Sequence, residues 1–142
     1  MRQRSRVALA VTFAGAALAY AYWWDYLPPR TPAKVARIYS GLPVSSRVRT
    51  ISFREQWSPI AGDGVVELRL QLDEKQFKAV QRAALIHGYK PTLASSRDEQ
   101  TIVQKFGAPL AGWYRYSEQG QSFELVVLDS ARKQLMIAAV ER

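Results

Sequence analysis

The sequence predicts an α+β protein, with an N-terminal transmembrane helix followed by a small antiparallel sheet that has helices on one face. An uncharged apolar run near the N-terminus predicts the membrane helix. Beyond it, stretches in which apolar and polar residues alternate predict strands, and stretches with apolar residues at helical spacing predict helices. The expected order is a β-hairpin, a helix, a short helix and a three-stranded meander.

The membrane segment is the strongest signal in the sequence. Residues 1–6 contain three arginines and no acid, and residues 7–24 are 18 residues without a charge. As a helix this run spans about 27 Å, close to the ~30 Å hydrocarbon core of a bilayer. Because arginines resist translocation, we expect residues 1–6 to form a cytoplasmic basic tail and everything after residue 24 to lie outside the cytoplasm. In a bacterium, that location is periplasmic or extracellular.

A cleaved signal peptide is the alternative interpretation of the same segment. A basic start, a short apolar run and small residues also describe such a peptide, and A-x-A sites end at Ala19 and Ala21. The apolar run continues past both sites into an aromatic cluster, which is typical of the lipid–water boundary. We therefore predict a single-pass signal-anchor, with secretion after cleavage near Ala19 or Ala21 as the alternative.

A proline-rich spacer separates the predicted anchor from the predicted domain. Residues 25–32 contain three prolines, which favour an extended, stiff chain and stop a helix. The exported domain is expected over residues 33–142. It should open with a short helix over 33–39, because Thr31 and Pro32 fit the N-cap and first helical positions and Gly41 follows.

A β-hairpin is the next expected element. Residues 47–57 alternate, and Val66, Leu68, Leu70 and Leu72 alternate with polar or smaller neighbours, so both stretches predict half-buried strands. The loop between them, Ser58–Gly64, is rich in proline and glycine, as a hairpin connection requires.

Two helices and a meander follow the hairpin. Asp73 and Gln76 have capping-box spacing, and Gly88 suits a helix C-terminus, so we expect a helix over 74–87. Ser96 and Glu99 repeat the box and predict a shorter helix ending before Gly107, although a strand over 101–106 also fits. Three apolar or mixed runs, 112–117, 122–128 and 133–140, are expected to form the antiparallel meander.

Composition excludes several classes of site. The chain has no cysteine, so a thiol nucleophile, a disulfide scaffold and a cysteine-bound metal are impossible. The single histidine cannot form a histidine-rich metal site. We therefore expect neither a cofactor nor a metal.

Four residues are candidates for chemistry, and each fits a structural role better. Asp63 lies between two glycines, where Asp-Gly supplies the positive φ of a turn. His87 falls in the last turn of a predicted helix, where it favours the helix dipole. Glu55 and Glu67 lie on adjacent predicted strands and could approach as a glycosidase pair, but the nearby Arg54 and Arg69 suit surface ion pairs better. We assign no catalytic residue.

A basic balance is the remaining signal. From Thr31 onward the chain has 16 Lys+Arg and 11 Asp+Glu, and the arginines concentrate on the hairpin, at Arg47, Arg49, Arg54 and Arg69. Nucleic acid would be a candidate partner for a cytoplasmic chain, with Trp57, Tyr114 and Tyr116 as stacking residues. Because export is predicted and no RNA- or DNA-binding motif is present, we expect no nucleic acid.

These observations predict a non-enzymatic, membrane-anchored exported domain that binds another exported or envelope protein. The exposed edges of the hairpin and the meander would serve by strand addition, although no binding residue can be named. The alternative is a cationic module that binds anionic lipid headgroups or a wall polymer. A small envelope hydrolase using Asp63, Glu55, Glu67 or His87 is the third possibility.

Overall fold

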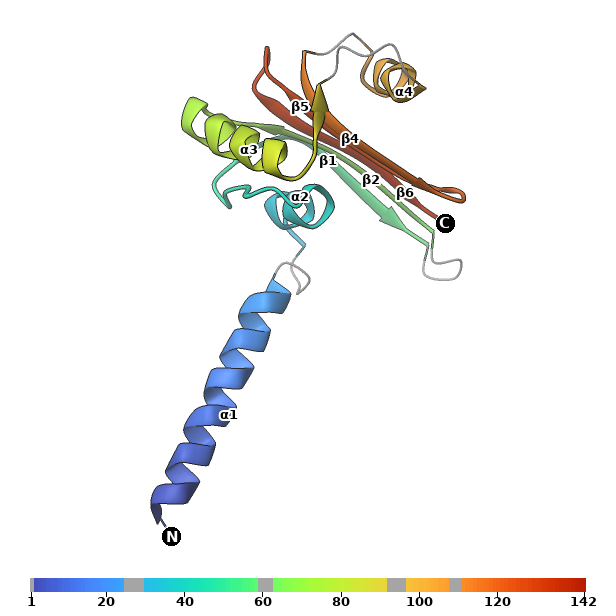
Figure 1. The fold of residues 1–142 in the computed structure, drawn as a ribbon. Helices are drawn as coiled ribbons and strands as arrows, with labels where there is room; N and C mark the ends of the chain where they lie inside the picture. Colours follow the sequence, from blue (N-terminus) through green and yellow to red (C-terminus); the bar gives the residue numbers. More distant parts are fainter. Residues whose placement is uncertain (1, 25–29, 59–62, 92–96, 108–110) are drawn as a thin grey trace.

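The structure, a computed structural model, describes residues 2–24, 30–58, 63–91, 97–107 and 111–142, with side chains from Thr12 onward. It has the predicted α+β class, and its elements follow the predicted order with one short additional strand, β3 (Figure 1). In chain order they are α1 (Arg2–Trp23), α2 (Pro32–Ser40), β1 (Arg49–Trp57), β2 (Gly64–Gln71), α3 (Glu74–Ile86), β3 (Lys90–Pro91), α4 (Arg97–Phe106), β4 (Gly112–Gln119), β5 (Ser122–Asp129) and β6 (Gln134–Glu141).

The strands form one antiparallel sheet in the order β1-β2-β6-β5-β4-β3. The hairpin β1–β2 and the meander β4–β5–β6 were both expected, and both are confirmed. What joins them is the pairing of β2 with β6, from Gly64 opposite Glu141 to Gln71 opposite Gln134. The C-terminal strand therefore lies in the interior of the sheet.

Helices cover both faces of the sheet, which corrects the expectation of helices on one face. On the α2/α3 face, Val35, Phe77 and Val80 pack over Leu68 and Ile137. On the opposite α4 face, Ile102 packs against Tyr114, Leu125, Val127 and Met136. The reason lies in β5 and β6, where residues 125–129 and 135–139 are all buried, so neither face of these strands is left to solvent.

The ends of α2 and α3 carry the capping groups that the sequence predicts. The Thr31 side chain accepts a hydrogen bond from the Lys34 backbone N–H at 3.3 Å, and Gly41 ends α2 with a φ of 66°. Asp73 and Gln76 form a reciprocal capping box at the start of α3. Gly88, with a φ of 73°, follows the end of α3.

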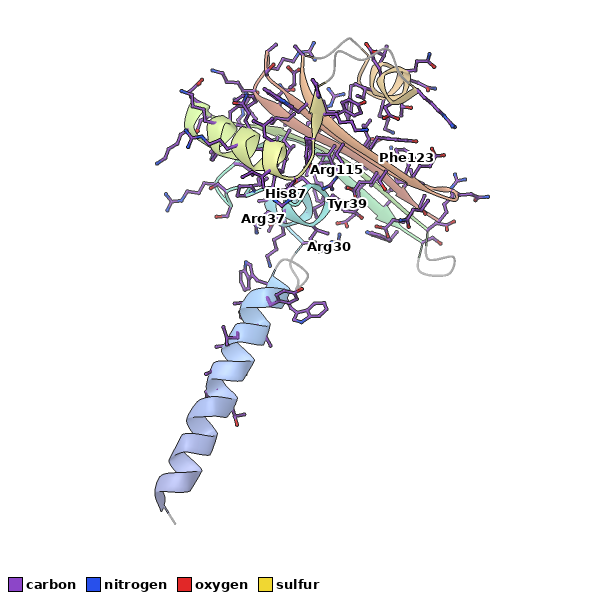
Figure 2. The ribbon with its side chains drawn as sticks, in the orientation of Figure 1. Arg30, Arg37, Tyr39, His87, Arg115 and Phe123 are labelled. Atoms are coloured by element: carbon purple, nitrogen blue, oxygen red, sulfur yellow. The ribbon has the colours of Figure 1, made fainter. Side chains whose placement is uncertain are left out.

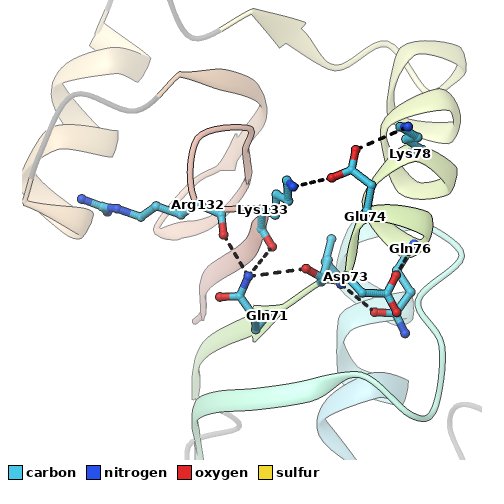
Figure 3. A network of polar contacts seen from close by, with 8 residues as sticks. Gln71, Asp73, Glu74, Gln76, Lys78, Arg132 and Lys133 are labelled. Atoms are coloured by element: carbon cyan, nitrogen blue, oxygen red, sulfur yellow. Dashed lines mark hydrogen bonds and ion pairs between the residues drawn. The ribbon is translucent and has the colours of Figure 1, made fainter.

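The start of α3 is also tied to the turn between β5 and β6 (Figure 3). Lys133 forms an ion pair with Glu74, the first residue of α3. Gln71, the last residue of β2, donates from Nε2 to the carbonyl oxygen of Arg132 at 2.9 Å. These contacts hold α3 in a set position on the sheet.

Strand β1 is more exposed than the alternation predicts. Its residues are exposed except for Phe53 and Glu55, which are half-buried, and Ile51 and Trp57 are 47% and 42% exposed. A register shift between Thr50 and Ser52 interrupts the ladder, so Ile51 does not continue the inward row. Residues 97–106 are helical, so the strand considered over 101–106 is wrong. Ser96 and loop residues 59–62 lie outside the described residues.

Helix α1 is a 22-residue helix that extends away from the domain (Figure 1). Within the described residues, no helix combines the length and the apolar character that a membrane span requires. The transmembrane assignment of residues 7–24 therefore stays a prediction.

The attachment of α4 can be tested through Ile102, the buried residue of that helix. Ile102→Ala should lower the free energy of unfolding by about 2–4 kcal/mol, because it leaves a cavity over Leu125 and Val127. The measurement is urea denaturation followed by circular dichroism. Val103→Ala, the exposed neighbour on the same helix, should change stability by less than about 0.5 kcal/mol. Equal effects of the two variants would contradict the packing of α4.

Candidate functional site

The two glutamates considered as a catalytic pair lie on opposite faces of the sheet. Glu55 is opposite Val66, whose side chain is buried on the α2/α3 face, whereas Glu67 follows Val66 and projects from the α4 face. Glu55 forms an ion pair with Arg30 at 2.9 Å, and Glu67 forms one with Lys105 of α4 at 2.6 Å. The two glutamates therefore do not form a catalytic pair. Each is in an ion pair, as the sequence favoured, but with Arg30 and Lys105 as the partners. Arg54, which lies opposite Glu67 in the β1–β2 register, and Arg69 add to the lowering of the Glu67 pKa by Lys105.

Asp63 and His87 take structural positions. Asp63 is exposed, and its carbonyl oxygen accepts the backbone N–H of Ser58 at 2.8 Å, which closes the hairpin loop. His87 is the exposed C-cap of α3, and its N–H donates to the Ala83 carbonyl oxygen at 2.9 Å. Across the residues with described side chains, no group of three or more acids or histidines could hold a metal ion.

Gly64 has a role different from the one predicted. It does not have a positive φ; instead, a Cβ at this position would lie 2.4 Å from the ring of Trp57. A side chain at this position would collide with the indole ring of Trp57, which lies against the first residue of β2. The Asp63-Gly64 pair therefore marks a close packing contact and not a turn conformation.

Arg30 holds the chain that leads into α2 against β1. Its guanidinium lies 2.9 Å from a Glu55 carboxylate oxygen and 5.7 Å from the centre of the Trp57 ring. Trp57 in turn donates from its indole nitrogen to Glu55 at 2.9 Å. The Glu55 side chain is only 13% exposed. We call these three residues, Arg30, Glu55 and Trp57, the Arg30 clasp.

A second polar group lies where α2 meets the sheet, around Tyr39 and Arg115 (Figure 2). The Tyr39 hydroxyl donates to Glu141 at 2.9 Å, and Arg115 donates to the Tyr39 carbonyl oxygen. Arg115 also forms an ion pair with Glu124 at 2.5 Å. Tyr39, Glu124 and Glu141 line a shallow pocket of about 230 Å³. Each of these carboxylates already has a partner within the chain.

Two tyrosines beside this group have raised pKa values. Burial raises the pKa of Tyr39 well above its usual range, and the hydrogen bond to Glu141 adds to the effect. Burial likewise raises the pKa of Tyr89, whose hydroxyl donates to the Ser40 carbonyl oxygen at 2.7 Å. Both tyrosines therefore stay neutral hydrogen-bond donors at physiological pH and serve packing.

The edge of the sheet at β1 is the candidate binding site. Within the described sheet β1 pairs only with β2, so one side of a nine-residue strand has no neighbouring strand. Arg49 and Arg54 are exposed along it, and Glu55, its acidic residue, is neutralised by Arg30. The strand therefore presents unpaired backbone groups flanked by positive charge.

The opposite edge offers a shorter stretch. Strand β3 pairs with β4 only at Trp113 and Tyr114, which leaves residues 115–119 of β4 without a described neighbour on that side. Arg115 in that stretch is engaged with α2 and Glu124. The β1 edge is therefore the longer of the two.

Sequence reasoning missed the residues that organise this region. It identified neither Arg30 nor Tyr39 nor Arg115 as structural contacts, because each reaches a partner far along the chain. The sequence offered one signal, the position of Arg30 in a stretch with prolines on both sides. This signal does not identify the residue with which the arginine pairs.

Comparison with known proteins gives no match: no family model, no curated protein and no solved structure matches the chain.

The Arg30 clasp can be tested by Arg30→Ala. The change removes the partner of the largely buried Glu55 carboxylate, and stability should fall by about 1–2 kcal/mol. Trp57 should become more exposed, which shifts its fluorescence emission to longer wavelength; changing the other tryptophans to phenylalanine isolates this signal. Arg54→Ala, an exposed arginine next to Glu55, is the matched control and should leave both readings unchanged.

The pKa of Glu67 provides a test of the α4 contact. The hydrogen bond from Lys105 holds this pKa below its usual value. Glu67 therefore stabilises the fold above its unfolded-state pKa, and this contribution is lost as the pH falls through the lowered folded-state pKa. The contribution is small because the side chain is 41% exposed. Lys105→Met should raise the pKa of Glu67 toward its usual value in an NMR titration, although Arg54 and Arg69 still lower it. Lys75→Met should leave this pKa unchanged; an unchanged pKa in Lys105→Met would refute the contact.

Proposed function

We propose that this chain is a non-enzymatic, membrane-anchored exported domain that binds another exported or envelope protein by strand addition at β1. One observation carries the proposal: β1 is a nine-residue edge strand with no described neighbour on its outer side. A free edge of this length is a ready template for an extended segment of a partner.

The anchor in this proposal is α1, with the N-terminus in the cytoplasm. A helix of 22 residues is about 33 Å long, which is near the ~30 Å thickness of the hydrocarbon core. Tyr20, Tyr22, Trp23 and Trp24 at its end are exposed, as side chains at a lipid–water boundary would be in the absence of lipid.

The charge along β1 favours an acidic partner segment. Arg49 and Arg54 are exposed on this strand, whereas Glu55 is occupied by Arg30. The same arginines, together with the register shift at Ile51, disfavour pairing of β1 with another copy of itself. We therefore propose an extended, acidic segment of another protein as the ligand.

A binding role suits the separation of the polar candidates better than catalysis does. Glu55 and Glu67 are on opposite faces, and Asp63 and His87 are exposed, one directly before β2 and the other directly after α3. No two of these four side chains are arranged as a nucleophile and the base that would activate it. Changing Asp63, Glu67 and His87 together to alanine should leave recovery of the partner intact if the proposal is right.

Charge reversal on β1 tests the partner. Full-length protein is captured from detergent-solubilised membranes, and co-purifying proteins are quantified by mass spectrometry. The double variant Arg49→Glu/Arg54→Glu should lower recovery of the partner by on the order of tenfold, with a weaker effect at high salt. Arg97→Glu, an exposed arginine on α4, is the charge control and should retain the partner. Absence of any enriched protein, or equal recovery in all variants, would refute the proposal.

Proline substitution then tests strand addition itself. Neighbouring residues of a strand direct their backbone groups to opposite sides, so one of Phe53 and Arg54 points its N–H outward. Proline at that position blocks an added strand and leaves the β1–β2 ladder intact. Phe53→Pro and Arg54→Pro are each compared with the alanine variant at the same position, which accounts for loss of the Phe53 ring from the core. The proline variant that keeps the unfolding temperature of its alanine counterpart should lose the partner. Retention of the partner by that variant would exclude strand addition at β1.

A further inference from the structure

The outer face of α3 has a composition that the packing of the domain does not explain. Phe77, Val80 and Ala84 are the buried residues of this helix. The residues on the opposite side, at helical spacing, are Lys75, Arg82 and Ile86, with Lys78 and Leu85 beside them. All five are exposed, and Ile86 and Leu85 reach 84% and 57%.

This outer face is basic as well as apolar. The acid at its border, Glu74, is engaged by Lys78 at 3.4 Å and by Lys133 of the β5–β6 turn. The positive charges of Lys75 and Arg82 are therefore not matched by an acid on the same face of the helix. A helix surface with lysine and arginine beside large aliphatic side chains is typical of segments that lie at a membrane interface.

The end of α1 is held close to the helices of the domain. The amine of Lys34, on α2, lies 4.0 Å from the centre of the Trp24 ring, directly after α1. Lys34 is only 4% exposed, so this contact is part of the packed structure. Together with the Arg30 clasp, it restrains the domain at the end of α1 instead of leaving it on a free tether.

The C-terminal end of α3 lies toward the same side. In Figure 2, His87, which directly follows α3, and Arg37 of α2 are both labelled on the side of the domain from which α1 leaves. In Figure 1, α3 runs across the direction of α1 and not along it. A helix in this orientation can lie along a surface that α1 crosses.

We infer that the outer face of α3 lies on the anionic surface of the bilayer and fixes the orientation of the domain there. Ile86 and Leu85 enter the headgroup region, and Lys75 and Arg82 contact lipid phosphates. The inference rests on the proposed function, because α1 must cross the same bilayer. It places the lipid contact on α3, whereas the sequence suggested the arginines of the hairpin.

The absence of cysteine makes the inference directly testable. Full-length protein carrying Ile86→Cys, labelled with an environment-sensitive fluorophore, is reconstituted in nanodiscs of phosphatidylcholine with or without phosphatidylglycerol. Quenching by lipids brominated near the headgroup should be strong at position 86 in anionic nanodiscs and weak in neutral ones. Val103→Cys, on the α4 side of the sheet, is the control on an exposed apolar residue and should not be quenched.

Charge variants separate the electrostatic contribution. The double variant Lys75→Glu/Arg82→Glu should weaken the contact of α3 with the lipid surface. The ratio of lipid-bound to lipid-free α3, measured by quenching of the label at position 86, should fall by about fivefold for each positive charge removed. Arg97→Glu should leave quenching unchanged. Circular dichroism before labelling checks that each variant is folded. We expect all of them to fold, because the substituted residues are exposed.

A third label distinguishes failure of the inference from failure of the anchor. Phe13→Cys, on α1, should be quenched by lipids brominated deep in the acyl chains. Quenching at position 13 without quenching at position 86 would keep the anchor and overturn the α3 contact. Absence of quenching at position 13 would overturn the anchor and, with it, the inference. The label at position 86 could also be shielded from water in native membranes but not in nanodiscs that contain no other membrane protein. That result would show that another protein covers the outer face of α3, and it would overturn the inference.

Discussion

The rest of the structure depends on the burial of both faces of strands β5 and β6 along five consecutive residues of each. Residues 125–129 and 135–139 are buried without interruption, so both faces of the sheet must be covered at this point. On one face α2 and α3 supply Val35, Phe77 and Val80, and on the other α4 supplies Ile102. If either face of this apolar strand pair were exposed to water, less apolar surface would be buried on folding. The remaining burial would then not offset the conformational entropy that the domain loses when it folds. The positions of all three domain helices follow from this requirement.

The same arrangement determines what remains available for binding. Because β5 and β6 need neighbours on both sides, β2 and β4 flank them, and β1 becomes the outer strand on the hairpin side. Its polar side chains and register shift are consistent with an edge that is not used for packing. The Arg30 clasp ties this edge to the chain that leads from α1, so the candidate binding strand and the predicted anchor are mechanically linked. A partner bound at β1 would thus be held at a set distance from the membrane, which gives the proposed function a physical basis.

The sequence predicted most of the fold but little of the candidate site. The hairpin, the helices and the meander follow from local periodicity and capping, and the Asp73–Gln76 box and Thr31 cap are confirmed. The face covered by α4 was predicted wrongly, although the unbroken apolar runs of β5 and β6 carry a signal that both faces are buried. For the site, Glu55 and Glu67 could be placed on adjacent strands from the sequence. Which faces they project from depended on strand pairing and register.

The sequence by itself determined the class of the domain, its element order and the caps of its helices, because these depend on contacts between residues a few positions apart. Only the tertiary structure decided that β2 pairs with β6, that α4 crosses to the second face, and that Arg30 pairs with Glu55. Each of these contacts joins residues at least a dozen positions apart, and Arg30 and Glu55 are separated by 25 positions. Their partners are selected by the burial of the whole sheet, which no local pattern of residues encodes.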